Sequence, residues 1–119
     1  MSNSFCSAYF SQNISEKSSH FHDCHQIILI LNGEVEVCVN GETVRANAGN
    51  LLIFSRFENH SLRILSEEYE RYVLRISPLF GNDNKMRSLL LNRPQGFNNV
   101  FDIGDDIHLF KSLFERIVF

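Results

Sequence analysis

The sequence is defined first by what it lacks: it has no tryptophan, no basic run and no long apolar run. A membrane span needs roughly 20 consecutive apolar residues, and no segment approaches that, so we expect no membrane association. A secretory signal peptide begins with a positive segment followed by an apolar one, and the first residues show neither. Phosphate contacts need clustered Lys and Arg, whereas the net charge is −3. We therefore expect this chain not to bind duplex DNA at physiological salt.

Cysteine is too scarce and too irregularly spaced for a disulfide framework, because Cys6, Cys24 and Cys38 are an odd number. A reducing compartment is the simplest setting, and we predict a cytoplasmic protein. Glycine-rich phosphate loops and nucleophile elbows are also missing. Asp23 beside His22 and His25 is the one acid–base candidate, but adjacent residues point to opposite sides of a strand. The sequence therefore favours a protein that is not an enzyme.

Two Asn-Gly dipeptides are the most informative feature that is present. Asn32-Gly33 and Asn40-Gly41 bracket residues 34–39, which alternate between polar and apolar. Asn-Gly favours the type I′ turns of tight hairpins. The pattern predicts an antiparallel meander of three strands over residues 27–31, 34–39 and 42–46.

Further short strands are predicted on both sides of this meander. Residues 51–54 are continuously apolar, which indicates a strand buried on both faces. Residues 60–65 and 69–77 follow, and Pro78 ends the last strand because it has no N–H to donate. The Ser- and Asn-rich residues 1–19 are predicted to be a flexible lead-in with an edge strand at Tyr9-Phe10. Seven or eight short strands with tight turns are typical of a sandwich or barrel, and the eleven phenylalanines predict a core rich in Phe.

The C-terminal part predicts two helices, over residues 84–92 and from Asp105 or Asp106 onward. The second helix carries an apolar stripe at three- and four-residue steps, and it stops without a capping residue, so we expect a chain cut within something longer. One part of the stripe should cover the β-structure. The rest is predicted to form a homodimer contact, with Leu113 beside the four stripe residues Ile107, Phe110, Phe114 and Ile117.

A histidine cluster precedes the meander, and its spacing resembles the two motifs of the cupin family. His20-x-His22, Gln26 and Gly33 match the first motif, and Gly49 followed by His60 matches the second. The resemblance implies a mainly β fold, a cupin-like antiparallel β-barrel (jelly roll) over residues 1–80, followed by two α-helices in residues 81–119. It also implies a metal site at His20, His22 and His60. Gln26 stands at the family's glutamate, Ser55 at its usual proline and Phe57 at its usual glycine.

The chain also resembles the N-terminal sensor domain of AraC-type transcription regulators. The resemblance lies in the runs at 22–28, 48–53 and 69–78 with Gly33 and His60, and in the two helices that follow. It implies an effector-sensing and dimerisation domain, with DNA bound only by a further domain that nothing in this chain resembles. The small-molecule effector is expected in the barrel mouth, at His20, His22, Gln26 and His60. His25 is predicted on the outer face. An apolar floor is predicted from five residues of the strands: Ile28, Ile30, Leu52, Phe54 and Leu74.

The histidines allow two interpretations. Either they bind Zn²⁺, Ni²⁺ or Fe²⁺ with Gln26 as a weak fourth ligand, or they pair with each other, with Asp23 or with water. We expect no cofactor. The rival function is a stand-alone metal-dependent cupin enzyme of the dioxygenase, isomerase or decarboxylase type. A third class, a purely structural dimerisation module, predicts a barrel packed solid with side chains.

Overall fold

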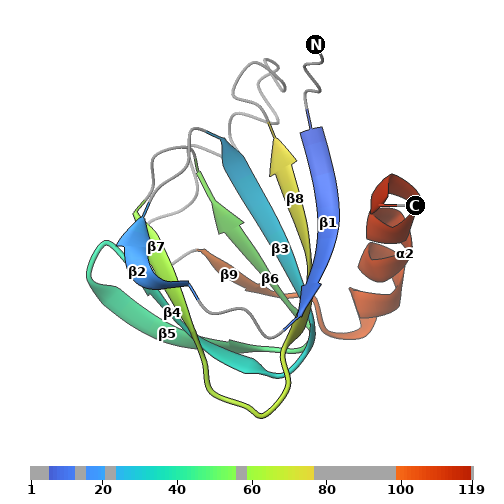
Figure 1. Cartoon of the computed structure of the whole chain (residues 1–119). Coiled ribbons are helices and arrows are strands. Elements are labelled where there is room, and N and C mark those ends of the chain that lie inside the picture. The colour runs from blue at the N-terminus through green and yellow to red at the C-terminus, as the bar shows by residue number, and fades with distance from the viewer. Residues whose placement is uncertain (1–5, 13–15, 21–23, 56–58, 77–98, 119) are drawn as a thin grey trace.

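The computed structural model describes residues 6–12, 16–20, 24–55, 59–76 and 99–118, which form nine strands and a C-terminal helix (Figure 1). The 3₁₀ turn η1 (Gly104–Asp106) leads into the helix α2 (Ile107–Val118). The strands are β1 (Cys6–Gln12), β2 (Glu16–His20), β3 (His25–Asn32), β4 (Glu34–Val39), β5 (Glu42–Asn47), β6 (Asn50–Phe54), β7 (His60–Ile64), β8 (Glu70–Ile76) and β9 (Val100–Asp102).

The described strands form two separate antiparallel sheets rather than one closed barrel. The larger sheet has the order β1-β8-β3-β6-β9 and the smaller one β2-β7-β4-β5. Figure 1 shows the two sheets as facing layers. Alternating side chains of both sheets fill the space between them, and the fully buried members of this core include Ile28, Ile30, Val35, Val37, Leu52, Leu62 and Val73.

The predicted three-strand meander is right at its second turn and wrong at its first. At Asn40-Gly41 the φ angles are 50° and 86°, and β4 pairs with β5 through Val39 and Glu42. This is the expected two-residue hairpin. At Asn32-Gly33, however, the chain passes from one sheet to the other, since β3 pairs with β6 and β8. Gly33 has a φ of 98°, and a Cβ there would collide with the backbone oxygen of Glu68.

The predicted flexible lead-in over residues 1–19 is wrong for most of the part that the structure describes. The edge strand expected at Tyr9-Phe10 extends over all of β1 and pairs with β8 from Cys6–Ile76 to Gln12–Glu70. A second strand, β2, pairs with β7. Backbone hydrogen bonds to a neighbouring strand hold these segments, so their polar composition did not reveal them.

The helix α2 covers the outer face of the larger sheet, beside β1 (Figure 1). Phe114 is 5% exposed and stacks on Tyr72 with ring centroids 5.9 Å apart. Leu29, Leu51 and Ile53 complete this second core. The second predicted helix, from Asp105 or Asp106 onward, is therefore confirmed as α2, which begins at Ile107 after η1. The helix expected over 84–92 and the boundary near residue 80 lie outside the described residues.

The cores are mainly aliphatic, so the predicted Phe-rich interior is wrong for the described residues. Only Phe54 and Phe114 among the phenylalanines of that part are buried, and Phe10 is 43% exposed. Val, Ile and Leu suit the pleated surface of a sheet better, and they occupy most inward positions. No helix in the described ranges is long and apolar enough to cross a membrane.

Candidate functional site

One end of the sandwich gathers the polar residues that the sequence singles out. Here β3 and β7 begin, and β6 and β8 end. The strand register places Gln26 of β3 opposite Phe54 of β6 on one side and opposite Arg75 of β8 on the other. Directly opposed residues share a face of the sheet. All three therefore lie on the face that looks toward the smaller sheet.

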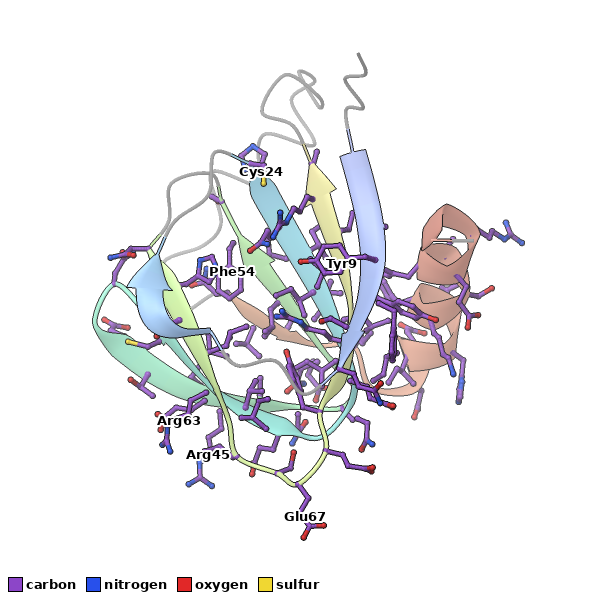
Figure 2. All side chains as sticks on the ribbon, viewed as in Figure 1. Tyr9, Cys24, Arg45, Phe54, Arg63 and Glu67 are labelled. Carbon is purple, nitrogen blue, oxygen red and sulfur yellow. The ribbon has the colours of Figure 1, made fainter. Side chains whose placement is uncertain are left out.

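Gln26 and His60 reach this site from different sheets, and Phe54 links them. The imidazole of His60 stacks on the Phe54 ring, with centroids 4.0 Å apart and planes 4° apart. Gln26 is 2% exposed and His60 is 1% exposed. Figure 2 shows Phe54 in the space between the two sheets. Both residues thus lie beside Phe54 at this end of the sandwich.

The predicted apolar floor is correct for four of its five residues. Ile28, Ile30, Leu52 and Phe54 belong to the core between the sheets. Leu74 instead packs in the second core, beneath α2. Because side chains alternate along β8, the inward positions belong to Val73 and its neighbours of the same parity. His25, opposite Ile76 in the register, has the outer-face parity that the sequence predicts, although it is buried.

The metal prediction depends mostly on residues that the structure does not describe. His20 lies opposite His60 in the register of β2 and β7, but its side chain and all of His22 lie outside the described part. Of the residues predicted to bind the metal, the described donors at this end are the His60 imidazole and the Gln26 amide oxygen, and the latter is a weaker metal ligand than a carboxylate. Among the described residues, no group of three or more His, Cys, Asp or Glu side chains is arranged to hold a metal ion. A metal at His20, His22 and His60 stays a prediction.

Arg75 and Tyr9 belong to the site although sequence reasoning did not select them. Arg75 Nη2 donates a hydrogen bond to the Tyr9 hydroxyl at 3.3 Å, and the guanidinium carbon lies 5.5 Å from the centre of the Tyr9 ring. Figure 2 shows Tyr9 directed from β1 into the space between the sheets. Arg71, also inward on β8, has Ser11 as a partner at 2.8 Å.

Alternating arginines on a strand normally indicate a solvent-facing side. Here the pattern misleads, because β8 lies inside the larger sheet and its other face is needed against α2. Tyr72 and Leu74 occupy that outer face, so their neighbours Arg71, Val73 and Arg75 turn inward. The register alone reveals this, and nothing in the sequence pattern of β8 would have found it.

Gln26 Oε1, an acceptor, and Arg75 Nε, a donor, are buried polar atoms at this end that have no hydrogen-bond partner within the described ranges. Buried polar groups in folded proteins are nearly always paired. Their positions are opposite each other in the register, yet the two atoms do not bond to one another. The site therefore offers a hydrogen-bond donor and an acceptor that the described protein does not use.

The stripe predicted to form a dimer packs largely within the chain. Ile107 and Phe110 contact the second core, and Phe114 is part of it. Phe114 is buried within the chain and stabilises its packing, and a dimer contact through this helix stays a prediction. The side chain of Ile117 lies outside the described residues. On α2, Leu109 and Leu113 are the exposed large apolar residues, at 58% and 45%.

A cavity of about 440 Å³ lies between α2 and the larger sheet. Its walls come from both elements and contain no polar residue. Such a volume is in the range of ligand pockets, but pockets that select a ligand usually also present polar groups. The lining residues are Ile27, Leu51, Ile53, Leu74, Phe101, Phe110, Leu113 and Phe114.

Comparisons with solved structures agree with this architecture. ToxT from Vibrio cholerae O395, bound to (E)-4-(8-methylnaphthalen-1-yl)but-3-enoic acid, superposes with a TM-score of 0.64 at 14% identity, over 95% of this chain and 48% of ToxT. The cupin domain of Cnp3 from Schizosaccharomyces pombe gives 0.60 at 19% identity, over 66% of this chain and 61% of that one.

The DMSP lyase DddQ from Ruegeria pomeroyi gives a TM-score of 0.54 at 23% identity, over 63% of this chain and 40% of DddQ. Because the match to ToxT covers 48% of that protein, this chain spans about half the length of ToxT. No curated protein matches the sequence. The cupin domain family matches residues 12–75, the segment that contains β2 to β7, most of β8, and Gln26, His60 and Arg75 of the polar end. The chain therefore belongs to the cupin family.

Proposed function

We propose that this chain is the effector-sensing domain of an AraC-like transcription regulator and is not an enzyme. The observation that carries the proposal is the extent of the likeness to ToxT, an AraC-family regulator. That likeness covers 95% of this chain, whereas the matches to Cnp3 and DddQ cover 66% and 63%. The added coverage supports a relationship that includes the segment around α2 as well as the cupin strands.

The proposed effector site is the polar end of the sandwich. Gln26 and His60 supply directional polar groups above an apolar floor, which is the usual composition of a small-molecule site. The buried and unused Gln26 Oε1 supports this placement, because a ligand that donates a hydrogen bond would satisfy it. The small organic molecule bound to ToxT is compatible with an effector of similar size. DNA binding would belong to a domain outside this chain.

Effector binding would act on the rest of the regulator by favouring one arrangement of the C-terminal part. The larger sheet joins the two regions: its inner face carries Gln26 and Arg75, and its outer face carries α2. A ligand that binds one arrangement more tightly shifts the population toward it by that difference in affinity. This coupling is part of the proposal.

A ligand library screened by thermal unfolding tests the function. A compound at 100 times its Kd stabilises the fold by about 2.7 kcal/mol, which raises the Tm of a domain of this size by roughly 10 °C. We expect a hit to lose most of this shift in Gln26→Leu, which removes the polar group. Thr43→Val, exposed on β5, is the matched control and should keep the shift. A hit that Gln26→Leu binds equally well would place the effector elsewhere.

The rival function is a stand-alone metal-dependent cupin enzyme, and the likeness to the lyase DddQ supports it. Such an enzyme needs a complete ligand set at His20, His22 and His60. Stoichiometric Fe, Ni or Mn in protein purified without chelators would favour the enzyme over the sensor.

A further inference from the structure

The guanidinium of Arg75 is the one feature of the polar end that the proposed function leaves unexplained. It lies half-buried on the inner face of the larger sheet, with Gln26 opposite it in the register. Its neighbours in the sequence, Leu74 and Ile76, face the other side of the sheet by parity. The charge of Arg75 therefore faces the space between the sheets.

Arg75 has no anionic partner among the residues that the structure describes. Its contacts there are the hydrogen bond from Nη2 to the Tyr9 hydroxyl and the stacking over the same ring. Tyr9 is uncharged, and Arg75 Nε has no hydrogen-bond partner within that part. By contrast, Arg63 on the outer surface is paired with Glu36 at 3.1 Å. A charge withdrawn from water is costly unless an opposite charge compensates it.

Tyr9 holds the Arg75 guanidinium in position without neutralising its positive charge. The Tyr9 hydroxyl accepts from Nη2 and the Tyr9 ring lies against the guanidinium, which leaves the Nε–H without a partner among the described residues. An arginine presents its N–H groups in a planar fork that matches the two oxygens of a carboxylate. Gln26, on the neighbouring strand, adds an unused acceptor, Oε1.

We propose that Arg75 anchors the effector by a carboxylate, so the effector is a small organic acid. Its carboxylate accepts hydrogen bonds from the Arg75 guanidinium. The apolar body of the acid lies against Phe54, at the end of the packed core that contains Ile28 and Leu52. A hydroxyl or amine on the same molecule would donate to Gln26 Oε1. This inference rests on the proposed function and names the chemical class of the effector.

The test measures the binding of a panel of monocarboxylic acids, acetate, hexanoate, decanoate, benzoate and 1-naphthoate, each paired with its primary amide. Isothermal titration calorimetry is carried out on the unmodified chain. We expect at least one acid to bind and its uncharged amide to bind at least about tenfold more weakly, because a hydrogen bond to a charged group contributes about 1.5–3 kcal/mol. Binding of amides and acids with equal affinity would overturn the carboxylate inference and leave the sensor function standing.

Variants assign the effect to Arg75. Arg75→Gln should weaken binding of the acid at least about tenfold, and Arg75→Lys, which keeps the charge but not the fork, should have an intermediate effect. Arg45→Gln removes the same charge from an exposed position on β5 and should bind normally. Circular dichroism confirms that each variant is folded. If Arg75→Gln and Arg45→Gln bind the acid equally, Arg75 is not the anchor. If neither acids nor amides nor any compound of the library binds, the sensor function fails together with this inference.

Discussion

Gln26 occupies the position at which the cupin resemblance implies a glutamate, and the difference is one of charge. A neutral amide lowers the attraction for a divalent cation and removes the internal counter-ion that a carboxylate would give Arg75 on the neighbouring strand. The presence of Gln rather than Glu at position 26 therefore affects two interpretations of this end of the sandwich, the metal site and the acid site.

We expect Gln26→Glu to raise the affinity for Zn²⁺ or Ni²⁺ at least about tenfold, because it restores an anionic oxygen donor. Calorimetry with each metal measures the change. Thr43→Glu adds the same charge on the exposed side of β5 and should have no effect. Unchanged affinity in Gln26→Glu would mean that His20, His22 and His60 do not form a metal site with residue 26. The double variant Gln26→Glu/Arg75→Gln separates metal binding from pairing with the arginine.

At the scale of elements, α2 and β8 are joined by one aromatic side chain. Tyr72 stacks on Phe114, contacts the Phe10 ring at 5.8 Å, and donates a hydrogen bond to Glu115 at 3.3 Å. Burial raises the pKa of Tyr72 above 10.0, and the charge of Glu115 and its hydrogen bond raise the pKa further. The folded chain thus holds this proton more tightly than the unfolded chain does.

The raised pKa makes the docking of α2 sensitive to alkali. Stability from Tyr72 is fully present below pH 10 and is lost as the pH rises through the raised pKa, with a slope of at most about 1.4 kcal/mol per pH unit. Urea unfolding between pH 7 and 11 should therefore show a steeper decline for the unmodified chain than for Tyr72→Phe. Glu115→Gln removes the charge but not the burial, so its decline should be intermediate. Equal declines in all three proteins would contradict the role given to Tyr72.

At the scale of the whole molecule, the face around α2 keeps exposed apolar surface. Leu109, Leu113 and Phe10 are the exposed large apolar residues among those described, and α2 contacts the strand that carries Phe10. Symmetric dimers bury such patches against an identical copy. A homodimer through the C-terminal helix stays a prediction, but its centre moves from Phe114 to Leu109 and Leu113.

We expect Leu113→Glu to weaken self-association at least about tenfold, because it places a charge in an apolar contact. Sedimentation equilibrium measures the dimer constant, and Ser112→Glu, an exposed neighbour on α2, is the matched control. Phe114→Ala should instead lower the free energy of unfolding by about 3–5 kcal/mol, since the side chain is buried. A strict monomer at high micromolar concentration would remove the dimer for this chain.

Local patterns in the sequence determined much of this protein. Alternation over residues 34–39, the Asn40-Gly41 turn and the apolar run at 51–54 all predicted their elements, because local backbone preference and two-fold periodicity act over a few residues. The spacing of Gln26 and His60 likewise predicted that they share one end of a cupin fold. In the structure, Gln26 lies opposite Phe54 in the register, and the His60 ring stacks on Phe54.

Only the tertiary structure decided which sheet each strand joins and which way β8 faces. The crossing at Gly33 depends on the approach of the Glu68 backbone from a distant part of the chain, and β1 is held by backbone hydrogen bonds that its polar side chains do not reveal. Arg75 turns inward because Tyr72 and Leu74 are needed against α2. These outcomes depend on long-range pairing and on competition between two faces for burial, and a strand's own sequence carries no information about its neighbours.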